Sequence, residues 1–166
     1  MQTPDITPGM NGLLIAVDDP RGDDVRAVLE RHLLFAHEQT PVEYVHALDV
    51  EGLLDPAITF YSARRRGRVL GVGAIKQLDP AHGELKSMHT IAEARNQGVA
   101  RALLDHLLSV ATELGMARVS LETGTTDVFE PARRLYRKAG FVPCGPFGPY
   151  TDSPRNYFMT KELDGS

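Results

Sequence analysis

The sequence has little that would mark a secreted, membrane or nucleic-acid-binding protein. Its single cysteine, Cys144, excludes an internal disulfide and favours a reducing, cytoplasmic setting. The longest aliphatic run near the start, Leu13–Val17, is too short for a signal sequence or a bilayer span. A formal net charge of -4 gives no general attraction to nucleic acids or anionic membranes. We therefore expect no nucleic-acid partner and no membrane partner.

Several common site motifs are also missing. Gly71-Val72-Gly73 has no third glycine opening a helix, so the dinucleotide-binding fingerprint is absent. The phosphate loop of nucleotide hydrolases is excluded because no glycine-lysine pair precedes a serine or threonine. The 6 histidines lack the HExxH spacing, and one cysteine is too few for most zinc sites. We expect no metal site.

What the chain does contain is the composition of an ordinary globular domain. Hydrophobic residues make up 42% of its 166 residues and charged residues 24%, which suits a single domain with one substantial core. Prolines and a glycine near the start predict a flexible lead-in over residues 1–11. The domain proper is expected over residues 12–166.

Apolar periodicity predicts a mixed α/β domain of the α+β type. Residues 84–91 should form a central strand in which Leu85 and His89 share one face. In chain order the pattern predicts a strand at 13–17, helices from 23 to 40 and at 44–54, strands at 58–63, 69–75 and 84–91, a helix at 99–114, a strand at 118–122, a helix from about 131 to 139, and strands at 141–144 and 157–160.

Four arginines lie in the predicted hairpin turn at 64–68. One interpretation is a nucleic-acid surface, which would bind in a salt-sensitive way. The other is a solvated turn whose charges guard a sheet edge. The acidic balance of the chain favours the solvated turn.

The central strand is followed directly by a turn and a long helix. Gly98 lets the backbone approach a ligand closely, and Arg95 and Arg101 flank the turn. The first amides of a helix have no acceptor within the helix, and the helix dipole is positive at that end. The 95–101 turn therefore predicts a local anion site.

The motif Arg95-x-x-Gly98-x-Ala100 resembles that of the GNAT acetyltransferases, which use acetyl-coenzyme A. Leu121-Glu122-Thr123-Gly124 and Leu135-Tyr136-x-x-x-Gly140-Phe141 resemble later segments of the same family. The resemblance implies a mostly antiparallel sheet of six to seven strands, flanked by about four helices, with splayed fourth and fifth strands. It also implies transfer of an acetyl group from acetyl-CoA to a small-molecule or peptide amine, with no metal, and family habit suggests a homodimer.

The resemblance further implies where the coenzyme binds. The pyrophosphate would lie on the turn amides, and the pantetheine arm would lie beside the central strand as if it were an added strand. Many family members have an asparagine that contacts the pantetheine arm where this chain has Phe129. Either the Phe129 ring packs against the arm, or another group supplies the contact. The candidate coenzyme-binding residues are Met88, His89, Thr90, Arg95, Asn96, Gln97, Gly98, Val99, Ala100, Arg101, Thr123, Phe129, Ala132, Tyr136 and Lys138.

Amine acetylation sets two chemical demands. An alkyl amine must lose a proton, which costs about 4 to 5 kcal/mol at pH 7, and the departing thiolate must gain one. By resemblance Glu84 is a candidate base, or else a strand glutamate bonded to a neighbour. Tyr136 is the candidate acid, with a buried core tyrosine as the alternative.

The resemblance leaves the acceptor unidentified. The first two helices and the proline-rich loop before the last strand usually form the acceptor side, so His37, Glu43, His46 and Tyr150 are candidate contacts, with surface or core roles as alternatives. A different class of function is also open, namely a sensor that binds an acyl-CoA without turnover. Thiol release that depends on an amine would separate the enzyme from the sensor.

Overall fold

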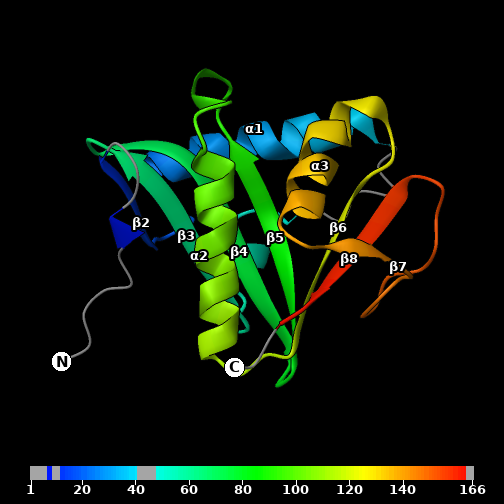
Figure 1. Ribbon diagram of the computed structural model, residues 1–166. Helices are drawn as coiled ribbons and strands as arrows, with labels where there is room; N and C mark the ends of the chain where they lie inside the picture. The colour runs from blue at the N-terminus through cyan, green and yellow to red at the C-terminus, as the bar shows by residue number, and fades with distance from the viewer. Residues whose placement is uncertain (1–6, 9–11, 41–47, 164–166) are drawn as a thin grey trace.

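The computed structural model describes residues 7–8, 12–40 and 48–163, which form one sheet and its covering helices (Figure 1). The sheet has eight strands in the order β1-β2-β3-β4-β5-β6-β8-β7. All neighbouring strands are antiparallel except β5 and β6, which are parallel. This confirms the mixed, mostly antiparallel sheet. The strands are β1 (Thr7–Pro8), β2 (Leu13–Val17), β3 (Ile58–Arg65), β4 (Arg68–Asp79), β5 (His82–Thr90), β6 (Arg118–Gly124), β7 (Val142–Cys144) and β8 (Asn156–Glu162).

Three α-helices lie within the described residues: α1 (Asp23–Gln39), α2 (Val99–Glu113) and α3 (Glu130–Lys138). Short 3₁₀ turns are η3 (Gly52–Leu54), η4 (Ala92–Ala94) and η5 (Asp127–Phe129). Helix α2 lies against one face of β3, β4 and β5, and α1 crosses behind these strands on the other face (Figure 1). Helices on both faces explain why Gly71 to Ile75 of β4 are all buried.

Glycines in β4 allow α2 to approach the sheet closely. A Cβ built on Gly73 would lie 2.6 Å from the Met88 sulfur and 3.1 Å from a Leu107 methyl group. A side chain at this position would therefore push α2 away from β5. Close packing holds the start of α2 directly over the end of β5, where the sequence predicts the anion site.

A gap opens between β5 and β6. Their parallel pairing covers only His82 to Glu84 of β5, and its last pair is Glu84 with Ser120. Beyond that pair β5 runs on to Thr90 and β6 to Gly124 with no pairing between them. These are the fourth and fifth long strands, so the structure confirms that they splay.

A bulge in β5 changes which side chains share a face. Val72 pairs with His89 and Ala74 with Lys86, so β5 has one extra residue here, and Ser87 has a φ of 56°. The prediction that Leu85 and His89 share a face is therefore wrong. Leu85 pairs with Ile75 on the α2 side, whereas His89 contacts His32 of α1.

Two other predictions meet the structure only in part. The helix expected at 44–54 lies partly outside the described residues, and within 48–54 only the short turn η3 is helical. In the expected lead-in, Thr7–Pro8 pair with Ile15 and Leu14 of β2, and the rest of 1–11 lies outside the described residues. No helix in the described part of the chain is long and apolar enough to cross a membrane.

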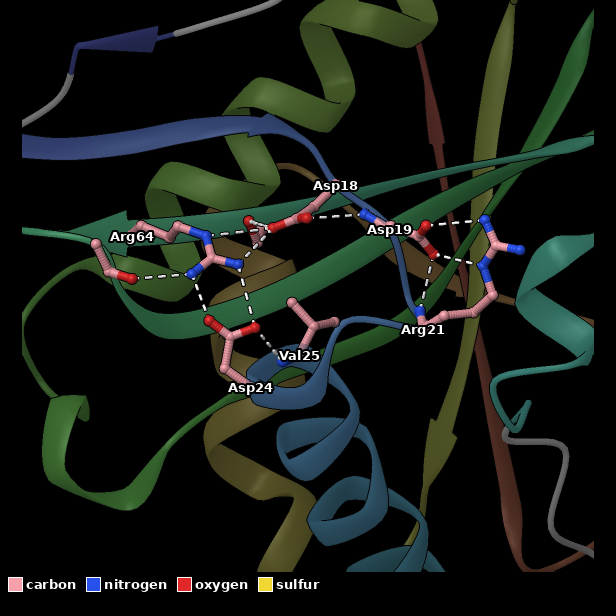
Figure 2. Close-up of polar contacts among 8 residues, drawn as sticks. Asp18, Asp19, Arg21, Asp24, Val25 and Arg64 are labelled. Atoms are coloured by element: carbon pink, nitrogen blue, oxygen red, sulfur yellow. Dashed lines mark hydrogen bonds and ion pairs between the residues drawn. The ribbon is translucent and has the colours of Figure 1, made fainter.

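Arg64, one of the four hairpin arginines, ties the start of α1 to the sheet (Figure 2). Its guanidinium contacts Asp18 at 2.9 Å and Asp24 at 2.6 Å, and Asp18 also accepts a hydrogen bond from Ser62. Because both carboxylates already neutralise it, Arg64 adds little to a basic surface. The interaction favours a structural role for this part of the hairpin.

Candidate active site

A cavity of about 810 Å³ runs through the gap between β5 and β6. Its walls come from the end of β5, the end of β6, the start of α2, one face of α3 and one face of α1. The cavity therefore connects the 95–101 turn to Glu84 on β5 and Glu122 on β6. The lining includes Glu84, Met88, His89, Thr90, Arg95, Asn96, Gly98, Val99, Ala100, Arg101, Thr123, Phe129, Ala132 and Tyr136.

The 95–101 turn has an unusual backbone, and all of its residues except Gln97 line the cavity. Asn96 has a φ of 63° and Gly98 a φ of 81°, both in the left-handed region that asparagine and glycine tolerate best. The first amides of α2, Val99 to Arg101, have no acceptor within the helix. Arg95 and Arg101 lie at the same cavity wall. This end of the cavity suits a phosphate or diphosphate.

The tip of the β3–β4 hairpin supports this turn from outside. Arg65 donates a hydrogen bond to the Gln97 side chain at 3.0 Å, and Gln97 donates to the Glu93 carbonyl at 3.1 Å. Arg68 lies 3.6 Å from the Glu93 carboxylate. Three of the hairpin arginines, counting Arg64, therefore have identified partners within the domain. Arg65 and Arg68 act as positioning residues for the turn.

Tyr136 reaches the cavity from α3. It is 7% exposed, and its ring packs against Phe141 with the centroids 5.8 Å apart. Burial raises its pKa to about 12, with a further contribution from the Glu122 carboxylate. The hydroxyl is therefore protonated at neutral pH and can donate a hydrogen bond into the cavity.

On β5, Glu84 forms a closed triangle of hydrogen bonds with Lys86 and Tyr150. Lys86 Nζ donates to Glu84 Oε2 at 3.1 Å and to the Tyr150 hydroxyl at 2.6 Å. The Tyr150 hydroxyl donates in turn to the same Glu84 oxygen at 2.5 Å. Burial and the Glu84 carboxylate raise the pKa of Tyr150. Glu84 is 2% exposed, so its charge depends on these two donors.

A second carboxylate faces the gap from β6. Glu122 is half-buried, lines the cavity and accepts a hydrogen bond from the Asn156 side chain at 3.1 Å. Its charge raises the pKa of both Tyr136 and Tyr150, after burial, which is the larger cause for each. Two carboxylates thus face one cavity from opposite sides of the gap.

Helix α1 spans the gap through two ring contacts. His32 meets His89 of β5 with their Nδ1 atoms 3.4 Å apart, and Phe35 meets Phe129 with ring centroids 5.5 Å apart. Burial lowers the pKa of His32 and of His89 to about 4, so both are neutral at pH 7. Phe129 rests on Gly124, where a Cβ would lie 2.2 Å from its ring. These contacts close the cavity on the α1 side.

The remaining predicted residues lie elsewhere. Gln97 and Lys138 do not line the cavity, and Lys138 is exposed in the last turn of α3. His37 is exposed on α1 and also lies outside the lining. Tyr150 reaches the site through Glu84 and Lys86. Glu43 and His46 lie outside the described residues.

The lining residues that sequence reasoning missed include two charged side chains, Lys86 and Glu122, and two rings of α1, His32 and Phe35. Two of them carried a signal. Lys86 follows Glu84 by two residues, so a strand places both on one face, and Glu122 belongs to a segment already noted for its resemblance. No signal marked His32 and Phe35, because their role depends on where α1 crosses the sheet.

A buried Ser–His pair at the base of the sheet does not have the arrangement of a hydrolase. His82 Nε2 lies 2.7 Å from Ser120 Oγ, and Arg118 lies 3.3 Å from His82 Nδ1. Arginine only donates, so Nδ1 accepts and Nε2 carries the proton. The imidazole therefore donates to Ser120 and cannot take its proton. Ser120 also contacts Thr160 at 2.9 Å, which fits a structural network.

Comparison with known proteins identifies the family. The model of the acetyltransferase (GNAT) family matches residues 23–141. The chain is 44% identical to YsnE, an uncharacterized N-acetyltransferase of Bacillus subtilis, over 90% of this chain and 99% of YsnE. It is 38% identical to an IAA acetyltransferase of Azospirillum brasilense, over 93% of this chain and all of that protein.

Solved structures show the same fold. A GNAT family acetyltransferase from Elizabethkingia anophelis, solved with acetyl-CoA bound, superimposes with a TM-score of 0.68 at 18% identity and covers 93% of this chain and 100% of its own. An aminoglycoside 6'-N-acetyltransferase complexed with coenzyme A gives a TM-score of 0.66 at 17% identity, over 89% of this chain and 96% of its own. With the family model and the relatives in agreement, the chain belongs to the GNAT family of acetyltransferases.

Proposed function

We propose that this enzyme transfers the acetyl group of acetyl-CoA to a primary amine by direct attack of the amine on the thioester. The observation that carries the proposal is one continuous cavity. It joins the 95–101 turn, which suits a diphosphate, to Glu84 and Tyr136 across the open edge of β5. A pantetheine arm along that edge would use backbone groups of β5 that have no partner on β6.

Tyr136 donates a hydrogen bond to the departing sulfur. Its pKa of about 12 lies about 3.5 units above that of an ordinary thiol, so complete proton transfer to the thiolate would cost about 5 kcal/mol. A hydrogen bond to the developing negative charge is favourable without that transfer. Solvent then protonates the thiolate after it leaves.

The amine's proton leaves through a carboxylate beside the gap. Glu84 is the first candidate base, and its side chain lines the cavity beside β5, which supports this role. Glu122 is the second candidate, because Glu84 Oε2 already accepts two hydrogen bonds, one of them from a cation. The lone pairs of Oε2 are thus already engaged by donors of the protein itself.

Calorimetry with acetyl-CoA and thiol release across a panel of amines test this function. IAA is tested beside the amines, because one relative is named an IAA acetyltransferase. We expect binding and amine-dependent release. Binding without release by any acceptor would favour a sensor, and no binding would refute the coenzyme site.

Two matched substitutions assign the base. We expect substitution of the true base by glutamine to lower kcat/KM by about 10²- to 10⁴-fold. The same substitution should remove the acidic limb of the pH profile of kcat/KM. Glu84→Gln and Glu122→Gln are compared with Glu162→Gln, an exposed glutamate on β8, as the control. Equal, small effects of all three would exclude a carboxylate base.

A further inference from the structure

We propose that Lys86 is itself an acceptor, and that acetyl-CoA acetylates its ε-amine inside the enzyme's own cavity. The inference rests on the proposed acetyl transfer to primary amines. Lys86 is a primary amine whose side chain is only 9% exposed, and it lines the same cavity as Glu84 and Tyr136. It is thus a resident member of the substrate class.

The contacts of Lys86 resemble those that a bound acceptor amine needs. Its ammonium lies 3.1 Å from Glu84 Oε2 and 2.6 Å from the Tyr150 hydroxyl. A carboxylate and a phenol together hold the charge in a site with little access to solvent. Lys86 therefore occupies an ammonium subsite at the wall of the reaction cavity.

The thioester is expected within reach of this amine. Lys86 lines the cavity together with Met88, beside which the pantetheine arm is expected, although the bulge turns their side chains to opposite faces of β5. Only the bulged Ser87 separates them. The lysine stem is unbranched and flexible, so Nζ can turn from Tyr150 toward the gap.

The reaction is the proposed acetyl transfer with a protein amine. Lys86 Nζ loses a proton to the Glu84 carboxylate, its lone pair forms a bond to the thioester carbonyl carbon, and the nitrogen then gives up a second proton to solvent. The carbon–sulfur bond then breaks, and the thiolate leaves with a hydrogen bond from Tyr136. The products are ε-acetyl-lysine and coenzyme A, with one proton released to solvent.

Acetylation would change the site in two ways. It removes the cationic partner of Glu84 and adds an acetyl group to the cavity wall. Because the added acetyl group takes up room in the cavity, we expect turnover of amines to fall in proportion to the fraction of Lys86 that is acetylated. The modification would make the enzyme self-limiting when acetyl-CoA is present without an acceptor.

The test incubates the full chain with acetyl-CoA and no amine. Cleavage after glutamate then releases Lys86 in the peptide 85–93, and mass spectrometry measures acetylation at all four lysines, Lys76, Lys86, Lys138 and Lys161. We expect Lys86 to react at least about tenfold faster than the exposed Lys138, since it is held beside the thioester. Acetic anhydride, which reacts according to exposure, should reverse that order.

Variants separate an enzymatic reaction from a chemical one. Tyr136→Phe should slow acetylation of Lys86 by the factor by which it slows amine turnover, and Lys161→Arg should leave it unchanged. Preincubation with acetyl-CoA should inactivate the native enzyme with time but not Lys86→Arg. An unmodified Lys86, or one that reacts no faster than Lys138, overturns the proposal.

Failure here is distinguishable from failure of the proposed function. If calorimetry detects acetyl-CoA binding and amines release thiol while Lys86 stays unmodified, the self-acetylation proposal is wrong and the acetyltransferase proposal stands. If acetyl-CoA does not bind, both are wrong.

Discussion

Replacing Tyr136 with phenylalanine removes one hydroxyl and keeps the ring that packs on Phe141. The hydroxyl is buried, with a pKa of about 12, so its contribution is a hydrogen bond to sulfur rather than a delivered proton. Hydrogen bonds to charged groups contribute about 1.5 to 3 kcal/mol. We therefore expect Tyr136→Phe to lower kcat by about 10- to 150-fold, with little change in the KM for acetyl-CoA.

The assay follows release of the coenzyme thiol under saturating amine. Tyr157→Phe, a half-buried tyrosine on β8 outside the cavity lining, is the control and should keep its activity. A pH series adds a second readout, because a phenol with a pKa of about 12 gives no loss of kcat below about pH 10. Unchanged turnover in Tyr136→Phe would remove the residue from the mechanism, and an alkaline limb near pH 8 to 9 that disappears in the variant would refute the pKa argument.

Three further perturbations follow from the cavity walls. Gly124→Ala should lower the free energy of unfolding in urea by about 1 to 3 kcal/mol, since the new Cβ meets the Phe129 ring. Adding Phe129→Ala to the same chain should relieve most of that loss, and additive losses of the two substitutions would contradict this. The folded-state pKa values of His32 and His89, about 4, lie below the unfolded value of about 6.5, so their contribution to stability is complete above pH 6.5 and is lost as pH falls to 4. His32→Gln should flatten that slope, and an unchanged slope would show that His32 titrates alike in the folded and unfolded states. Arg65→Ala should raise the KM for acetyl-CoA a few-fold at constant kcat, because its guanidinium supports the coenzyme turn, and a loss in kcat alone would refute a positioning role.

Most of the fold could be predicted from the sequence because local signals were strong and agreed with one another. Helix α2 begins after Gly98 and is followed by Gly115, which has the positive φ that a glycine-capped helix C-terminus needs. The bulge at Ser87 was not predictable in this way, because serine gives no signal for a positive φ in a strand. One extra residue there reverses the face of every later side chain in β5.

The candidate site was predictable where it depends on one segment and not where segments meet. The 95–101 turn is local, so its motif predicted an anion site and identified the family. Glu84 was also identified, but its chemistry could not be, because the partner that restrains it, Tyr150, is 66 positions away in the chain. The second partner of Glu84, the Lys86 ammonium, decides how Glu84 can act. To act as base for an acceptor, Glu84 must release the Lys86 ammonium and bind the acceptor's ammonium instead. The relative affinity of Glu84 for these two ammonium groups therefore determines whether the enzyme acetylates the acceptor or itself.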